Sequence, residues 1–226
     1  MCYTPAMSLA FAGAGAAGIT YVMSQKKPSY SIIGILAFYV LMELLQTLQY
    51  QITNECDNPI NVALTEVAYV FVIVQPLLWN AFFYANALPN ESLLFIAGMA
   101  LSGVWALFNI AGRLFYTPEN AQTRKDSMFA SNKVCTYRDV SHLYWKWKTA
   151  NMGDLNATFL AHLMIWFIPA LISLSQRTTA SIILAGAVLS GLYSLYVGQL
   201  DAFAAAWCYI SIPIIYIIFA KVIFRK

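Results

Sequence analysis

The sequence predicts an all-α membrane protein, a polytopic bundle of about seven transmembrane helices. Of its 226 residues, 60% are hydrophobic and only 10% are charged, a composition outside the range of soluble globular domains. The apolar residues gather in seven stretches, each close to the roughly 20 residues that a bilayer crossing needs. Because lipid offers the backbone no hydrogen-bond partners, each stretch is expected to be a helix.

Short polar breaks separate the expected spans. The spans are 6–24, 31–50, 59–83, 92–115, 158–175, 179–197 and 201–223. Turn-forming residues fill the breaks at 54–59 and 88–91. The break at 196–201 is so short that one longer kinked helix, giving six spans, is an alternative there. We expect one transmembrane domain over 1–226, with 116–157 as its extramembrane segment.

The first span is rich in small residues and is expected to pack tightly. Residues 12–18 are only Ala and Gly, which lets another helix approach closely. Gly98 with Ser102, and Gly186 with Ser190, repeat this pattern. No basic residue precedes the apolar run and no cleavage site follows it, so we interpret it as a retained helix rather than a signal peptide.

Basic residues predict the orientation. With seven spans, Lys26, Lys27, Arg177 and the C-terminal basic residues lie on one side, which is expected to be cytoplasmic. The N-terminus then lies on the outer, non-cytoplasmic side. The basic residues of the long segment 113–157 oppose this orientation, but long loops count less in the rule. The sequence does not specify which membrane it is.

The four cysteines lie toward the outer face in this topology. They are Cys2, Cys56, Cys135 and Cys208. An oxidising compartment on that side permits disulfides, and Cys56 with Cys135 is the expected pair. Cys208 has the alternative of being a small core hydrophobe.

The extramembrane segment ends in an aromatic stretch with interleaved lysines. At helical spacing, one face carries Val140, Leu143, Tyr144 and Trp147. The pattern predicts an interfacial amphipathic helix between spans four and five. A lid over an outward-facing cavity is the alternative. Its residues would be His142, Trp145 and Trp147.

Two acidic side chains lie well inside the expected spans, Glu43 and Glu66, whereas Asp201 is at the start of the seventh span. Each lies about seven residues from the outer end of its span, which corresponds to a depth of roughly 10 Å. Because consecutive spans joined by a short loop are antiparallel neighbours, the two carboxylates are expected to approach each other. At least one would then be protonated, since two charges in low dielectric repel strongly.

Further polar residues lie near these glutamates in the expected bundle. They are Gln46, Gln75, Asn80, His162 and Asp201. An outward-facing cavity with acid–base groups at several depths is typical of a proton- or cation-coupled transporter or channel. A protonated glutamic acid that bonds a neighbouring amide between helices is the structural alternative. From a different class, a non-catalytic subunit of a larger membrane assembly fits equally well.

Other chemistries find less support. Retinal binding needs a lysine inside the last span, whereas Lys221 is almost at its end. A membrane-embedded metal-dependent hydrolase is a remote alternative, because it needs several converging ligands. The available ones are His142, His162, Glu43, Glu66 and Asp201. We expect no catalytic residue, cofactor or metal, and an enzyme is not the favoured class. The net charge of +3 reflects loop bias, so the expected partners are the lipid bilayer, a second copy or a larger complex, and no nucleic acid.

Several short motifs resemble an uncharacterised multi-pass membrane family of algae and large DNA viruses. The motifs are Met1–Tyr3 with Ser8, Leu41–Gln46, Gln75–Pro76 and His142–Trp145. That family has a tryptophan where this chain has Tyr3. It also has a glutamine followed three residues later by a glutamate, the reverse of Glu43 and Gln46 here. The resemblance implies a membrane protein of about seven spans with no assigned activity.

Overall fold

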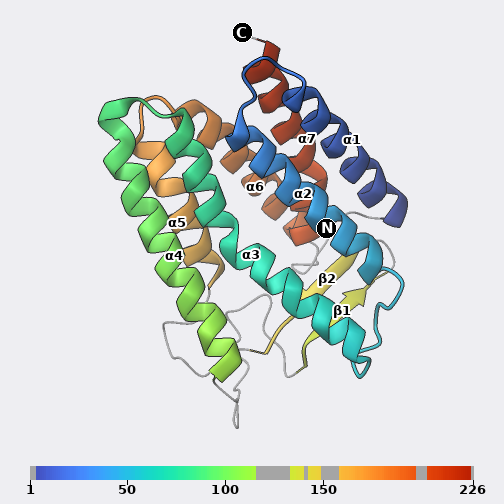
Figure 1. The fold of residues 1–226 in the computed structure, drawn as a ribbon. Coiled ribbons are helices and arrows are strands. Elements are labelled where there is room, and N and C mark those ends of the chain that lie inside the picture. Colours follow the sequence, from blue (N-terminus) through green and yellow to red (C-terminus); the bar gives the residue numbers. More distant parts are fainter. Residues whose placement is uncertain (1–3, 116–132, 140–141, 149–157, 197–202, 225–226) are drawn as a thin grey trace. The chain divides into compact units, whose positions relative to one another are not determined.

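The computed structural model describes residues 4–115, 133–139, 142–148, 158–196 and 203–224. Within these ranges the chain forms seven α-helices, one 3-10 turn and a two-stranded sheet (Figure 1). The helices are α1 (Pro5–Met23), α2 (Tyr30–Gln49), α3 (Pro59–Asn86), α4 (Ser92–Phe115), α5 (Phe159–Ile172), α6 (Arg177–Tyr196) and α7 (Phe203–Phe224). The turn η1 (Pro89–Glu91) precedes α4, and strands β1 (Cys135–Arg138) and β2 (Leu143–Lys146) precede α5.

Local sequence explains where several helices begin. The side chain of Thr4 accepts a hydrogen bond from the backbone N–H of Met7, and proline follows it at the first position of α1. Asn58 followed by Pro59 repeats this arrangement at the start of α3. Such residues satisfy or remove N–H groups that a helix leaves unpaired at its N-terminus.

Five of the helices, α1, α2, α3, α4 and α6, are long and apolar enough to cross a membrane. Helix α5 has 14 residues, a length of about 21 Å, which is shorter than a hydrocarbon core of roughly 30 Å. The structure therefore reproduces the helical class and the positions of all seven helices. Seven membrane spans stay a prediction.

The expected interfacial helix is wrong, because the aromatic stretch forms the second strand of a hairpin. Leu143 and Trp145 are buried in β2, whereas Tyr144 and Lys146 between them are partly exposed. This alternation has the period of two that a strand requires. The backbone N–H of Asp139 closes the turn by donating to the carbonyl of His142, at 2.9 Å.

The helices divide into two compact units. The first contains α1, α2, α6 and α7 with residues 138–144, and the second contains α3, α4 and α5 with residues 133–137 and 145–148. That the two units form one transmembrane domain stays a prediction.

Glycines permit close helix packing in the first unit. A Cβ atom added at Gly15 of α1 would lie 2.6 Å from Val40 Cγ2 on α2 and 2.8 Å from Tyr216 Oη on α7. A Cβ atom added at Gly186 of α6 would likewise lie 3.1 Å from Ile214 Cδ1 on α7. The small residues of the first span therefore serve helix packing, as the sequence predicts.

Aromatic side chains fill the core of the second unit, where α3, α4 and α5 pack against one another. The rings of Trp79 and Trp166 stack with their centroids 5.7 Å apart, and Phe167 stacks on Trp166 at 4.6 Å. Phe83 of α3 meets Phe95 of α4 at 5.9 Å. Large rings supply most of the dispersion energy of this unit.

Candidate functional site

The first unit contains a fully buried carboxyl group. Glu43 on α2 has no exposed surface, and neither have Gln46 and Gln49. The spacing of three residues places these side chains along one stripe of the helix. A buried polar stripe on an apolar helix is costly unless its members are bonded or functional.

Helix α1 brings a further polar group to the level of this stripe. Gly15 lies against Val40 and Gly18 against Leu36, so the antiparallel register places Ser8 opposite Gln46. The hydroxyl of Ser8 is buried and has no hydrogen-bond partner among the described residues. We name the three α2 residues Glu43, Gln46 and Gln49, together with Ser8 of α1 opposite them, the α2 polar stripe.

Glu66, the other predicted carboxylate, has a different environment in the second unit. Arg113 at the end of α4 donates to it through Nε, at 2.8 Å, and through Nη2. The guanidinium also lies 4.3 Å from the ring centroid of Tyr69. The side chain of Glu66 is 40% exposed and that of Arg113 is 11% exposed. Glu66 is therefore a carboxylate paired with a guanidinium about two turns from the start of its helix. Its expected approach to Glu43 stays a prediction.

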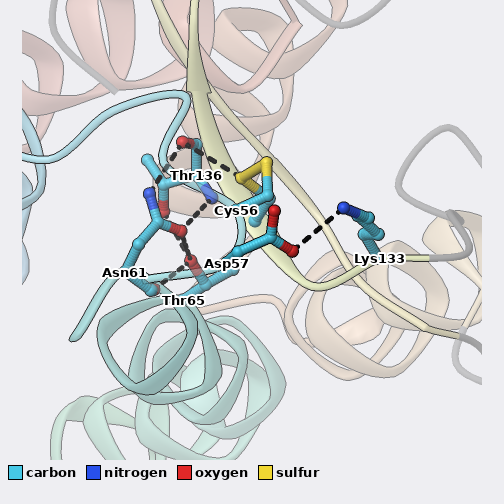
Figure 2. The surroundings of a disulfide bond; sticks show 7 residues. Cys56, Asp57, Asn61, Thr65, Lys133 and Thr136 are labelled. Atoms are coloured by element: carbon cyan, nitrogen blue, oxygen red, sulfur yellow. Dashed lines mark hydrogen bonds and ion pairs between the residues drawn. A yellow bond between two sulfur atoms is a disulfide. The ribbon is translucent and has the colours of Figure 1, made fainter. Parts of the chain in front are cut away.

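A disulfide joins Cys56 to Cys135 across 79 residues, the pair that the sequence predicts. Figure 2 shows the polar network beside it, in which Asn61 and Thr65 of α3 bind β1. The backbone N–H of Thr136 donates to Asn61 Oδ1 at 2.9 Å, and Asn61 Nδ2 donates back to the Thr136 carbonyl at 3.1 Å. This reciprocal pair fixes the strand to the first turns of α3.

Trp147 provides a second anchor between the hairpin segment and α3. Its indole N–H donates to the Thr65 carbonyl at 2.8 Å, and its ring meets that of Tyr69 edge-on at 5.5 Å. Like His142 and Trp145, Trp147 is buried. It therefore has a packing role, and a lid function for these three residues stays a prediction.

Asn80 connects all three helices of the second unit. Its Nδ2 lies 2.9 Å from the Pro76 carbonyl, 3.1 Å from the Ile165 carbonyl of α5 and 3.3 Å from Ser102 Oγ of α4. The Ile165 carbonyl lacks its usual helical donor because residue 169 is a proline. Asn80 therefore satisfies a backbone group that Pro169 leaves free.

Glu91 forms a polar cluster at the opposite end of this unit. Its carboxylate accepts from the hydroxyl of Ser173, at 2.8 Å, from the hydroxyl of Ser175 and from the backbone N–H of Leu174, at 2.6 Å. Hydrogen bonds from Ser175 first, then from Ser173 and the backbone, lower the pKa of Glu91 to about 2. The cluster joins the turn before α4 to the turn after α5.

The remaining predicted residues have varied outcomes. Gln75 and His162 are buried on α3 and α5. Cys2 and Asp201 lie outside the described residues, and the side chain of Cys208 is not described. Among the described residues no group of three or more His, Cys, Asp or Glu side chains is close enough to hold a metal ion.

Sequence reasoning missed Arg113, Asn61 and Asn109. Arg113 lies two residues before the outer end of its span and Glu66 seven residues inside the outer start of its own, so a long arginine side chain near the same face was a usable signal. Asn61 and Asn109 are fully buried, but an asparagine near a helix end gives no sign of its partner.

Comparisons with known proteins give a family without an assigned activity. A family model described as a "Family of unknown function (DUF5765)" matches residues 6–226. The protein described as "Uncharacterized protein R287", from Acanthamoeba polyphaga mimivirus, is 26% identical over 234 residues, which cover 94% of this chain and 91% of that protein. No solved structure matches the chain.

Proposed function

The chain belongs to this family of unknown function, and from its own side chains we propose that it is an integral membrane protein that transports protons or cations through the α2 polar stripe. Glu43 is the group that binds the ion. The observation that carries the proposal is the complete burial of Glu43 together with Gln46 and Gln49. A carboxyl group buried in an apolar helix is costly and usually has a function.

The chemistry of the stripe suits a proton or a small cation. A carboxyl group exchanges a proton directly, and amide oxygens such as those of Gln46 and Gln49 can replace water around a cation. Neither α1 nor α2 contains a lysine or an arginine, so neither helix provides a permanent positive charge that would compete with the ion.

Glu66 has a different part in the proposal. Its carboxylate already binds the guanidinium of Arg113, and such a pair holds a negative charge without exchanging it. We therefore assign the ion step to Glu43 alone and a structural role to Glu66.

The membrane location rests on the five long apolar helices. The disulfide supports an orientation, because disulfides persist on the oxidising side of a membrane. Residues 54–57 and 133–139 would then lie on the outer side, as would the N-terminus one helical hairpin earlier.

Flux into liposomes that contain the purified chain tests the proposal. A pH-sensitive dye and a cation-sensitive dye report proton and cation entry under an imposed gradient. We expect flux with the native chain and with the control Glu55→Gln, a substitution in the loop before α3. We expect Glu43→Gln to remove the flux, because the amide cannot exchange a proton, while circular dichroism shows that the helices persist.

Flux that survives Glu43→Gln would exclude Glu43 as the ion-binding group. No flux from any form would favour the second candidate, a non-catalytic subunit of a larger membrane assembly. The polar side chains of the second unit support that candidate, since Asn61, Asn80 and Glu91 all bond other parts of the chain. Such a subunit would migrate with large partners in mild detergent, whereas a transporter would migrate as a monomer or a symmetric oligomer.

A further inference from the structure

His162 is a buried imidazole between two indoles in the second unit. It is 7% exposed. Its ring centroid lies 5.9 Å from that of Trp105 on α4 and 5.6 Å from that of Trp166, whose ring is perpendicular to it. Its Nδ1 atom is buried and has no hydrogen-bond partner among the described residues.

Asn109 contributes a second unpaired atom one turn further along α4. Its Nδ2 donates to the Trp105 carbonyl at 2.8 Å, which holds the amide beside the tryptophan that His162 contacts. Its Oδ1 is buried and, within the described chain, also lacks a partner.

The helix register agrees with this placement. Gly98 lies against Pro169, and Trp105 lies against His162, so α4 and α5 run antiparallel with these residues at matching levels. Asn109 is one turn beyond Trp105, about 6 Å along the axis. His162 and Asn109 therefore lie about one helical turn apart on adjacent helices, and no hydrogen bond joins them.

Two buried polar atoms, one on α4 and one on α5, have no hydrogen-bond partner among the described residues. An unprotonated Nδ1 and an amide oxygen both accept hydrogen bonds, and buried acceptors without a donor are costly. A neutral ring that carries its hydrogen on Nε2 would become a donor toward Asn109 when a proton is added to Nδ1.

From this arrangement, we propose that His162 and Asn109 form an internal proton-binding site between α4 and α5. The proton bonds to Nδ1, and the imidazolium N–H donates to Asn109 Oδ1. Among the described residues of the packed helices, the titratable and charged groups toward this end of the unit are Glu66 and Tyr69 on α3 and Arg113 on α4. Arg113 is eight residues from Trp105, about 12 Å along the helix, and its charge is balanced by Glu66. The proposal does not rest on transport, because the site can bind a proton in a chain that conducts none.

Imidazole nitrogen spectra of the full chain in lipid nanodiscs test the site. The chain has two histidines, so a His142→Gln background leaves His162 as the one labelled ring. We expect this ring to take up a proton reversibly between about pH 8 and pH 4 while the protein stays folded. Asn109→Leu removes the acceptor and is expected to lower the midpoint by about one to two pH units, the effect of one charge-assisted hydrogen bond.

Asn109→Asp is the opposite change, and its carboxylate is expected to raise the midpoint. It also serves if the leucine variant fails to fold. An unchanged midpoint in a folded leucine or aspartate variant would overturn the proposal, as would a ring that stays neutral until the protein unfolds. Because no gradient or flux is measured, an inert transporter assay leaves this test unaffected.

Discussion

Substituting Gly15 by alanine tests the packing of α1 against α2 and α7 most directly. The new methyl group would lie 2.6 Å from Val40 Cγ2 and 2.8 Å from Tyr216 Oη, about 1 Å closer than a normal contact. Val40 is stiff in a helix because it is β-branched. The Tyr216 hydroxyl cannot retreat freely either, since it donates to the Phe11 carbonyl at 2.7 Å.

The expected size of the effect follows from three contributions. Overpacking costs about 1–3 kcal/mol, and losing the Tyr216 hydrogen bond costs about 0.5–1.5 kcal/mol. The better helix propensity of alanine returns about 0.5–1 kcal/mol. We therefore expect a net destabilisation of about 0.5–4 kcal/mol, with a middle value near 2 kcal/mol.

Gly13 provides a matched control two residues away in the same helix. A Cβ atom there would meet nothing within 4 Å, so Gly13→Ala should gain about 0.5–1 kcal/mol from propensity alone. Unfolding by SDS in mixed micelles, followed by circular dichroism, gives both free energies. Adding Val40→Ala to Gly15→Ala should recover part of the loss. Equal stability of the Gly15→Ala and Gly13→Ala proteins would refute the packing argument.

Three further perturbations test the second unit. Arg113→Gln should lower the free energy of unfolding by about 1–3 kcal/mol, because it leaves the Glu66 carboxylate without its guanidinium partner. Adding Glu66→Gln should recover part of this loss. A double variant no more stable than Arg113→Gln alone would contradict the pairing. Cys135→Ser should lower stability by about 2–4 kcal/mol, since the disulfide closes a long loop, and reductant should destabilise the native chain but leave this variant unchanged. The pKa of Glu91 is about 2 in the folded protein, against an ordinary value of 4.5. Its contribution to folding stability is therefore complete above about pH 4.5 and falls as the pH drops toward 2. Thermal unfolding at several pH values should show this loss of stability in the native chain and a smaller loss in Glu91→Gln.

The positions of the helices could be predicted because lipid-compatible stretches are long and their breaks contain proline, asparagine and charge. The start of α3 at Pro59 and of α4 at Ser92 coincide with the predicted ends of those breaks. The Cys56–Cys135 disulfide was also predictable, since topology brings both residues to one side of the bundle.

The hairpin was mispredicted because residues 143–147 satisfy two periods. Leu143 and Trp147 are four apart, which fits a helix face, but Leu143, Trp145 and Trp147 also alternate with Tyr144 and Lys146. Contacts distant in sequence decide between the two. The disulfide at Cys135 and the Asn61–Thr136 bonds fix β1 on α3, and β2 then pairs with β1.

The polar residues of the second unit show why a buried side chain is not by itself evidence of function. Considered alone, Asn80 indicates a functional polar group inside an apolar helix, and Pro169 indicates a hinge. In the structure they explain each other, because the proline frees the Ile165 carbonyl and the Asn80 amide donates to it across 85 residues of sequence. The amide has two hydrogens and three acceptors within reach, so its nitrogen is fully used in holding α3, α4 and α5 together, whereas its Oδ1 is buried without a partner among the described residues. Glu66 likewise has a partner, because its carboxylate is paired with the guanidinium of Arg113. The complete burial of Glu43 is the ground for the ion site proposed at the α2 polar stripe. The buried Nδ1 atom without a described partner is the ground for the proton site proposed at His162.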